Sequence, residues 1–377
     1  MERTQTKKLV PGLTGIRFFA AAYVFVMHYG ASAINKAGAP RPVATFLHNG
    51  VFGVSVFFIL SGFILAHAHP AAFATQRQYA VYFLHRFARI YPLYLFALVV
   101  ALPVAVADVP LDLKQAIAVL AMVQSWTDAF SHSGYAWIMQ AWTLSVELAF
   151  YLSFPFLIGM LRRLGTSLLL GFCILDVIFI ISGGTTTVTP WTDYGGYIHQ
   201  PVWPLYLPLP LVRSGEFLLG MLLHTIVTRL PRLALNFSAT HCVLACAAIV
   251  ALLSASSDER ALSAAAVLVG ILIAMIYVSD NAFTRLLGSR TLILLGNASY
   301  ALYLLQGPVH AYLGIFLPDP YDRLLGLPIS LAAAILAWRF VEIPARLYIL
   351  SLGHWRQNSA QILPQGNREA FPMKRDP

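Results

Sequence analysis

Ten long apolar stretches run through this chain of 377 residues, and they limit what it can fold into. They lie near residues 14–34, 50–69, 89–107, 141–160, 167–182, 207–228, 239–256, 261–279, 291–315 and 325–350. A helix needs about 20 apolar residues to cross a bilayer, and helices satisfy all their backbone hydrogen bonds there. The stretches therefore predict an all-α integral membrane protein with about ten transmembrane helices in one bundle.

Composition agrees with a membrane protein. Hydrophobic residues make up 58% of the chain and charged residues 11%, whereas soluble domains have about 45–50% and 25%. The net charge of +9 raises the alternative of a nucleic-acid partner, but the basic residues are scattered between apolar runs. That pattern is typical of cytoplasmic loops that face anionic lipid. The three cysteines have no neighbours that would complete a metal site, so we expect no nucleic acid and no metal.

The distribution of basic residues predicts the orientation of the bundle. Placing the N-terminus in the cytoplasm puts most of them on that side: Arg77, Arg86, Arg89, Arg162, Arg163, Arg229, Arg232, Arg285 and Arg290. This obeys the positive-inside rule, and ten crossings return the C-terminus to the cytoplasm. If the short run 113–125 also crossed, every later loop would flip. We therefore expect 113–125 to lie in an outer loop or to dip back into the membrane.

Domain organisation follows from the same stretches. Residues 1–351 are expected to form one membrane-embedded domain, and the polar residues 352–377 a disordered cytoplasmic tail. The outer loop 183–206 is rich in Gly, Pro, Thr and aromatic residues. Its aromatic rings are explained either by a position at the membrane interface or by stacking on sugar rings, and the sequence leaves both open.

The first apolar stretch, "TGIRFFAAAYVFVMHYG" (14–30), contains two ionisable side chains, Arg17 and His28. Charged side chains at a helix centre cost about 2.5–3.5 kcal/mol on insertion scales and usually mark a functional site. The two are eleven positions apart, so they share one face of a helix about 16 Å apart along its axis. Alone, Arg17 is also explained as a snorkelling charge and His28 as a packing histidine. The shared face favours a functional pair.

Further charged residues follow in the third and fourth stretches. Arg86 and Arg89 lie at the cytoplasmic start of the helix expected from the third stretch, either as a positive-inside anchor or as a phosphate-binding pair, since guanidinium groups match phosphate oxygens. Glu147 lies near the start of the fourth, at a depth that we predict to be comparable to that of His28. A carboxylate that orients a histidine is a common general-base arrangement. The sequence leaves open whether Glu147 and His28 touch.

Three other charged sets have simpler interpretations. Arg213 and Glu216 are three residues apart on one expected helix and predict an internal ion pair. Arg339, Glu342 and Arg346 near the end of the last stretch are interpreted as mainly structural. Asp176 stands alone in the fifth stretch, and the sequence assigns it no role.

Seven stretches, taken together and in order, resemble the acyltransferase-3 family of bacterial membrane acyltransferases. They are "LTGIRFFAAAYVFVMH", "GVFGVSVFFILSGFILA", "RFARIYPLY", "WTLSVELAFYL", "RSGEFLLG", "GNASYALYLLQGPV" and "RFVEIPAR", within residues 9–350. The resemblance implies a multi-pass protein of the bacterial inner membrane that transfers an acyl group, usually acetyl, from cytoplasmic acyl-CoA to a hydroxyl, often on a sugar.

The resemblance also assigns residues by position. His28 looks like the catalytic residue, Arg17, Arg86 and Arg89 look like donor-side residues, and Glu147 falls on the family's Trp-x-Leu-Ser-x-Glu segment. The chain departs from the family at two places. Leu148 and Ala149 follow Glu147 where many members have Glu-Gln, and Gln306 replaces a common histidine, so a proton role at that position is in doubt.

We therefore expect an O-acyltransferase in which His28, assisted by Glu147, removes the proton from an acceptor hydroxyl. A covalent acyl-histidine is the alternative route. The expected partners are acyl-CoA, a carbohydrate or glycolipid acceptor and membrane lipid, with no permanently bound cofactor. A proton-coupled secondary transporter of a small polar solute and a non-catalytic membrane scaffold are the rival classes. The acceptor, the acyl chain length, the oligomeric state and the role of Gln306 stay open.

Overall fold

The computed structural model describes residues 10–108, 113–126, 137–181, 201–202, 205–206, 208–229, 236–317 and 321–352. The expected disordered tail lies outside the described residues, apart from Leu352. Most of the aromatic loop 183–206 also lies outside them, so neither expectation is tested.

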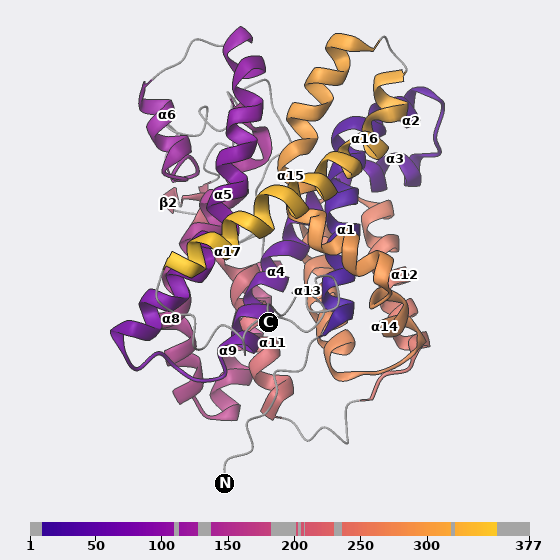
Figure 1. The fold of residues 1–377 in the computed structure, drawn as a ribbon. Helices are drawn as coiled ribbons and strands as arrows, with labels where there is room; N and C mark the ends of the chain where they lie inside the picture. The colour runs from indigo at the N-terminus through magenta and orange to yellow at the C-terminus, as the bar shows by residue number, and fades with distance from the viewer. Residues whose placement is uncertain are drawn as a thin grey trace, which may run out of the picture.

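The described part of the chain is helical apart from one pair of two-residue strands (Figure 1). In chain order the elements are α1 (Pro11–Phe25), η1 (Val26–Gly30), α2 (Ala31–Lys36), α3 (Arg41–His48), η2 (Asn49–Val51), α4 (Phe52–Ala68), α5 (Gln76–Asp108), α6 (Leu113–Leu120), η3 (Met139–Ala141), α8 (Trp142–Arg163), α9 (Thr166–Phe179), β1 (Pro201–Val202), β2 (Leu205–Tyr206), α10 (Leu209–Val212), α11 (Ser214–Arg229), α12 (Ala239–Ala255), α13 (Glu259–Val278), α14 (Ala282–Leu287), α15 (Arg290–Phe316), α16 (Tyr321–Ala337), η6 (Trp338–Glu342) and α17 (Ile343–Leu352). Strands β1 and β2 pair antiparallel, with Pro201 opposite Tyr206.

Eight helical segments among the described residues are long and apolar enough to cross a membrane. They are Pro11–Lys36, Arg41–Ala68, Gln76–Val106, Met139–Arg163, Leu209–Arg229, Arg260–Val278, Arg290–Phe316 and Leu325–Leu352. Two shorter apolar helices, Ser167–Phe179 and Ala239–Ala255, coincide with the two remaining predicted stretches. The all-helical membrane architecture is confirmed, and the predicted count of ten is supported for eight helices. The cytoplasmic placement of both termini stays a prediction.

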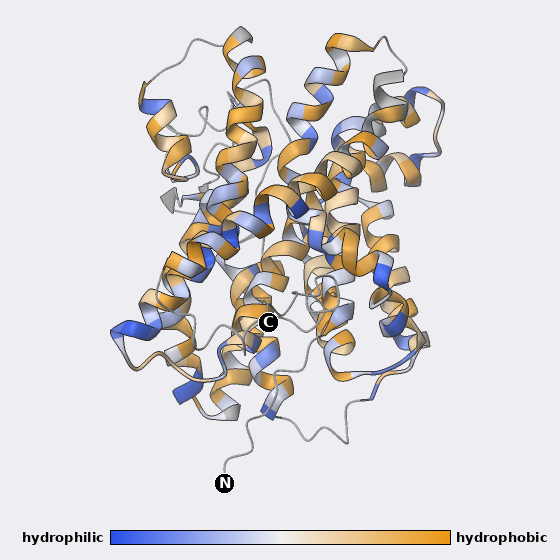
Figure 2. Ribbon diagram, in the orientation of Figure 1, coloured by the Kyte–Doolittle hydropathy of each residue, from blue (hydrophilic) through white to orange (hydrophobic). Residues whose placement is uncertain are grey.

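The hydropathy of the residues differs between the middle of the helices and the ends of the molecule (Figure 2). Hydrophobic residues dominate along their lengths, and hydrophilic residues gather at the ends of the molecule. Hydrophilic positions also occur midway, around the crossing of α5 and α17. Large apolar side chains stay exposed on the perimeter, Val99 and Phe156 among them, as expected for helices surrounded by lipid rather than water.

Helices α4 and α11 pack closely at the centre of the bundle. A Cβ atom built on Gly62 of α4 would lie 2.0 Å from the carbonyl oxygen of Phe217, and one built on Gly220 of α11 would lie 2.0 Å from that of Ile59. Two glycines facing each other's backbones therefore let the helices touch. This is the small-residue packing by which membrane helices associate, since lipid provides no hydrophobic driving force between them.

The run 113–125 forms the short helix α6 followed by a turn that enters the bundle. Eight residues of helix extend about 12 Å, too short to cross a membrane. After the turn at Met122, which has φ 54°, Gln124 and Ser125 are 1% and 6% exposed. Gln124 Nε2 donates to the Ala141 carbonyl at 2.7 Å, and Ser125 Oγ donates to the Trp142 carbonyl at 2.8 Å. The segment thus folds inward and braces the start of α8.

Two of the spanning segments contain a π-helical turn. η1 interrupts the first at Val26–Gly30, and η6 interrupts the last at Trp338–Glu342. After η6 the chain continues as α17, which crosses α5 diagonally (Figure 1). Inserted π turns are frequent at functional sites, and these two carry His28 and Glu342.

Candidate functional site

Four arginines and two glutamates from five helical segments gather at one level of the bundle. Arg17 of α1 interacts electrostatically with Arg89 of α5, Glu342 of η6 and Glu147 of α8. Arg346 of α17 interacts with Arg89, Arg86 and Glu342. We call these six residues the arginine cluster: Arg17, Arg86, Arg89, Glu147, Glu342 and Arg346. The structure therefore brings together all three arginines that the sequence assigned to the donor side.

The arginine cluster has more positive than negative charge, because four guanidinium groups face two carboxylates. The Arg86 guanidinium lies over the rings of Tyr82 and Tyr151, at 6.0 and 5.8 Å from their centroids. Its buried Nε atom has no hydrogen-bond partner among the described residues. Unmet cationic donors suit an anion with several oxygens, such as a phosphate group.

Glu342 and Arg346, for which the sequence predicts a mainly structural role, lie within this cluster. Glu342 is 4% exposed, and its Oε2 atom has no hydrogen-bond partner in the described part of the chain. The π turn η6 and the crossing of α17 over α5 position both side chains. A local sequence pattern does not encode a helix crossing, so this contact is not predictable from the sequence pattern.

Glu147 lies with the arginines. It accepts a hydrogen bond from the Tyr151 hydroxyl one turn later on α8, and its charge interacts with that of Arg17. None of the hydrogen bonds or ring contacts of His28 among the described residues involves Glu147. The physical reason is the depth at which α8 begins: Gln140 and Ala141, directly before it, are 2% and 1% exposed. Glu147, seven residues further, is about 10 Å deeper than Gln140.

His28 lies in the π turn η1, eleven residues after Arg17 on the same helical segment. Its side chain is half-buried, and its ring centroid lies 5.9 Å from that of Tyr29. The Tyr29 ring packs 5.1 Å from Phe25 and 4.1 Å from His310 of α15. The imidazole is therefore held beside α15, about 16 Å along α1 from the arginine cluster.

Two buried amides lie on the α15 side of η1 and were not identified as site residues from the sequence. Gln140 of η3 receives a hydrogen bond on its backbone carbonyl from the Tyr303 hydroxyl at 3.4 Å. Gln306 is fully buried, and its Nε2 donates to the Tyr303 carbonyl at 2.9 Å. The available signal for Gln140 was a polar side chain immediately before an apolar helix, which is weak because such positions often only cap or solvate a helix end. The signal for Gln306 was its place where a histidine is common in the family that the sequence resembles.

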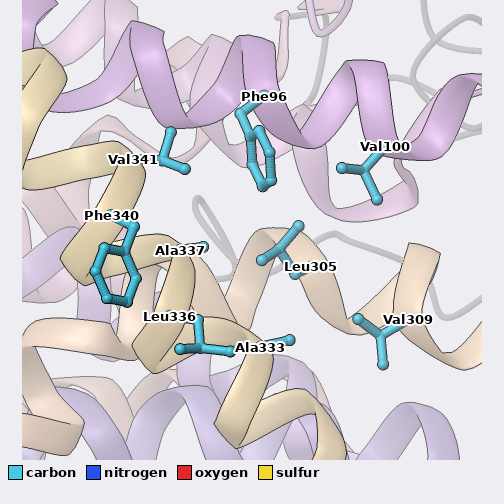
Figure 3. Close-up of a pocket in the computed structure, with 9 residues that line it drawn as sticks. All are labelled: Phe96, Val100, Leu305, Val309, Ala333, Leu336, Ala337, Phe340 and Val341. Carbon is cyan, nitrogen blue, oxygen red and sulfur yellow. The ribbon is translucent and has the colours of Figure 1, made fainter.

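An apolar pocket of about 370 Å³ lies between α5, α15 and the junction of α16 with η6 (Figure 3). Its lining is Phe96, Val100, Leu305, Val309, Ala333, Leu336, Ala337, Phe340 and Val341. Leu305 directly precedes Gln306, and Val341 directly precedes Glu342. With no polar group in its lining, the pocket suits an alkyl chain and offers no catalytic chemistry.

The predicted internal ion pair is confirmed. Arg213 and Glu216 are joined at 2.8 Å with side chains 4% and 0% exposed, and Arg213 also donates to Ser55 of α4 at 3.0 Å. Asp176 is 7% exposed, and its Oδ2 atom lacks a hydrogen-bond partner among the residues described. In the same ranges, no three His, Cys, Asp or Glu side chains come together to hold a metal ion.

Comparison with known proteins gives one family and several distant relatives. The family model of an acyltransferase domain, acyltransferase-3, matches residues 10–339. The chain is 34% identical over 166 residues to acyltransferase MdmB of Streptomyces mycarofaciens, covering 41% of each protein. It is 22% identical to O-acetyltransferase OatA of Staphylococcus aureus and 24% identical to peptidoglycan O-acetyltransferase OatA of Listeria monocytogenes, in both cases over 92% of this chain.

The relatives are longer than the matched region. The chain spans 41% of MdmB, 58% of the staphylococcal protein and 57% of the listerial one. No solved structure gives a significant match.

Proposed function

This chain belongs to the acyltransferase-3 family, and we propose that it transfers an acyl group, acetyl in the simplest case, from acyl-CoA to a hydroxyl of a cell-envelope glycan. The single observation that carries the proposal is the arrangement along α1. Arg17 lies in a cluster rich in arginine, and His28 lies about 16 Å further along the same helical segment. A bundle with a cationic anion site at one level and an imidazole at another suits a long donor with phosphates at one end and a thioester at the other.

Charge and geometry support the binding of acyl-CoA at the arginine cluster. The phosphates of CoA would bind the arginine cluster, where Arg86 retains an unmet donor atom. Guanidinium groups bind phosphates through two parallel hydrogen bonds. The extended arm of CoA would then run along α1 toward His28. Glu342 and Glu147 would hold the arginines in place, since each interacts with Arg17.

The chemical step assigns one role to His28. An imidazole nitrogen takes the proton of the acceptor hydroxyl while its oxygen attacks the thioester carbonyl. The carbon–sulfur bond breaks, the new ester forms, and the CoA thiolate leaves with the proton that the imidazolium returns. Glu147 lies outside hydrogen-bonding contact with His28 among the described residues, so we propose that His28 acts without it.

The protein is a multi-pass membrane protein, and we propose that it lies in the bacterial inner membrane with both termini cytoplasmic. In that orientation the arginine cluster faces the side on which acyl-CoA is made. The names of its relatives support a glycan as the acceptor, because two of them are O-acetyltransferases and one of these acts on peptidoglycan by name.

Acyl transfer in a purified system tests the proposed function. The protein in nanodiscs would be given radiolabelled acetyl-CoA and fragments of cell-envelope glycan, and ester-linked label in the glycan would be measured. We expect His28→Ala to abolish transfer and the matched variant His48→Ala, which changes an exposed histidine of α3, to keep it. Full activity in His28→Ala would exclude the catalytic assignment, and wild-type protein inert toward every glycan fraction would exclude the function.

A further inference from the structure

The apolar pocket of about 370 Å³ between α5, α15 and the junction of α16 with η6 opens on the outside of the bundle (Figure 3). Leu336 and Phe340 line it on one side and are 56% and 65% exposed. Val100 lines it on the other side and directly follows Val99, which is 62% exposed. All four residues belong to segments that are long and apolar enough to cross a membrane, where lipid surrounds the exposed side chains. The pocket therefore opens toward the bilayer.

Helix α15 forms the floor of the pocket and separates it from the reacting end of the site. Leu305, which is 3% exposed, and Val309 face the pocket. His310 directly follows Val309, and its ring packs 4.1 Å from that of Tyr29, the residue after His28. A molecule in the pocket therefore lies at a level close to that of His28, but the backbone of α15 stands between them.

Two hydrogen bonds fix the spacing of α5 and α15 at both ends of the pocket. The Tyr300 hydroxyl donates to the Ile90 carbonyl at 3.1 Å, and the Tyr312 hydroxyl donates to the Val100 carbonyl at 2.9 Å. The α15 residues of the lining lie between these two tyrosines in the chain. The helices cannot close over the space without breaking one of the bonds, and atoms around an empty space lose van der Waals contacts. An apolar occupant would restore those contacts.

The pocket is closed at the end near the arginine cluster. There η6 and α17 pack on α5, and the lining residue Val341 directly precedes Glu342 of the cluster. From Val341 the lining continues along η6 and α16 to Ala333, which is about 12 Å away along the helix. A chain in the pocket therefore has its inner end near the arginine cluster and leaves the pocket near Ala333. In the proposed orientation, the end at Ala333 faces the outer leaflet.

The lining and the opening together select the occupant. All nine lining residues are apolar, so the amides of a CoA arm or the hydroxyls of a glycan would be buried there without hydrogen-bond partners. An acyl chain on a thioester at His28 would have to cross α15, and a helix of a second copy is about 10–12 Å across, too wide for this volume. A lipid chain reaches the opening directly from the bilayer. We propose that the pocket binds one hydrocarbon chain of a membrane phospholipid whose head lies beyond Ala333, an inference that does not rest on the proposed function.

Native mass spectrometry of the full chain counts the lipids that stay bound. The protein would be reconstituted in nanodiscs of palmitoyl-oleoyl phosphatidylethanolamine and then extracted into mild detergent. Ala333→Phe fills the pocket, and Ala332→Phe is the matched control, because Ala332 is exposed on the same helix and lies outside the lining. We expect wild type and Ala332→Phe to keep one phospholipid and Ala333→Phe to keep about tenfold less, the equivalent of about 1.4 kcal/mol. Equal retention in all three proteins, or no retained lipid in wild type, would refute the site.

Stability and competition distinguish a lipid chain from other occupants. The Tm of Ala333→Phe in lipid-free detergent should be at least that of wild type, because filling an apolar space restores contacts. If Ala333→Phe does not fold, the smaller change Ala337→Val in the same lining should lower lipid retention in its place. Displacement of the phospholipid by palmitoyl-CoA would overturn the proposal in favour of a donor acyl chain. Dimers in wild type and Ala332→Phe but not in Ala333→Phe would overturn it in favour of a second copy. None of these measurements uses acyl transfer, so failure of the proposed function leaves the lipid site standing.

Discussion

The Tyr151 hydroxyl donates a hydrogen bond to the Glu147 carboxylate from one turn further along α8. This bond holds Glu147 on the side of Arg86 and Arg89. Both arginines also interact electrostatically with Tyr151. A carboxylate next to guanidinium groups orients them and balances their charge. The position of Glu147 therefore makes it a positioning residue for the arginine cluster and separates it from the imidazole of His28.

A charge-neutral substitution of Glu147 should accordingly affect donor binding. We expect Glu147→Gln to raise the KM for acetyl-CoA several-fold, because loss of a charge-assisted interaction is typically worth about 1–2 kcal/mol. The pH dependence of kcat should stay that of the wild type, since the carboxylate does not touch His28. Steady-state kinetics between about pH 5 and 9 checks both points. A displaced pH profile with an unchanged KM for acetyl-CoA would restore Glu147 to the role of orienting the base.

The arginines of α5 should act through their geometry as well as their charge. Arg89→Gln is expected to lower kcat/KM for acetyl-CoA by about 10–100-fold, the equivalent of about 1.4–2.7 kcal/mol. Arg89→Lys should keep only part of the wild-type kcat/KM for acetyl-CoA, because an ammonium group cannot form two parallel hydrogen bonds to a phosphate. The control is Arg77→Gln at the exposed start of the same helix. Equal losses in Arg77→Gln and Arg89→Gln would point to a general electrostatic effect of the membrane surface.

The contact between α4 and α11 should be sensitive to one methyl group. Gly220→Ala would bring a Cβ atom to 2.0 Å from the Ile59 carbonyl oxygen, which the helices can relieve only by moving apart. Overpacking of this kind costs about 1–3 kcal/mol, so we expect a clear fall of Tm in detergent. Gly171→Ala on α9 is the matched control, because nothing lies within 4 Å of its added Cβ. An equal Tm for the two variants would contradict the close packing described here.

Removing one charge of the buried ion pair Arg213–Glu216 should destabilise the protein more than removing both charges. Arg213→Leu leaves the Glu216 carboxylate, 0% exposed, without its partner, and breaking a buried pair in this way costs about 3–5 kcal/mol. The double variant with Glu216→Leu should recover much of the lost stability, since neither charge then remains buried. Unfolding of the two variants and the wild type in detergent measures the difference. A single variant as stable as wild type would show that Glu216 finds another partner.

Much of the architecture was predicted from apolar stretches alone, because a segment of about 20 apolar residues has few alternatives to a membrane helix. The prediction was least complete where helices are short. Stretches 167–182 and 239–256 form α9 and α12, which fall below spanning length in the described structure. The pairing of Arg213 with Glu216 was also predictable, since residues three apart on a helix are neighbours.

The site was predicted only in part. Arg17, Arg86 and Arg89 meet as expected, but the partner of Glu147 was not predictable from its depth. The predicted depth of Glu147 was counted from the end of an apolar stretch, as if that end lay at the membrane surface. In the structure α8 begins inside the bundle instead, where Gln124 and Ser125 hydrogen-bond to its first residues. Contacts between segments far apart in the chain decide such a depth, and periodicity along one helix does not record them.

The sequence by itself determined that this chain is a helical membrane protein of the acyltransferase-3 family and which helices carry ionisable residues, because both follow from local composition and order. Only the tertiary structure decided which of those residues meet. The crossing of α17 over α5 brings Glu342 and Arg346 to the arginines, and the inward turn before α8 brings Gln140 to the level of His28. Each contact depends on how separate helices pack, and packing is set by the whole bundle rather than by any one segment.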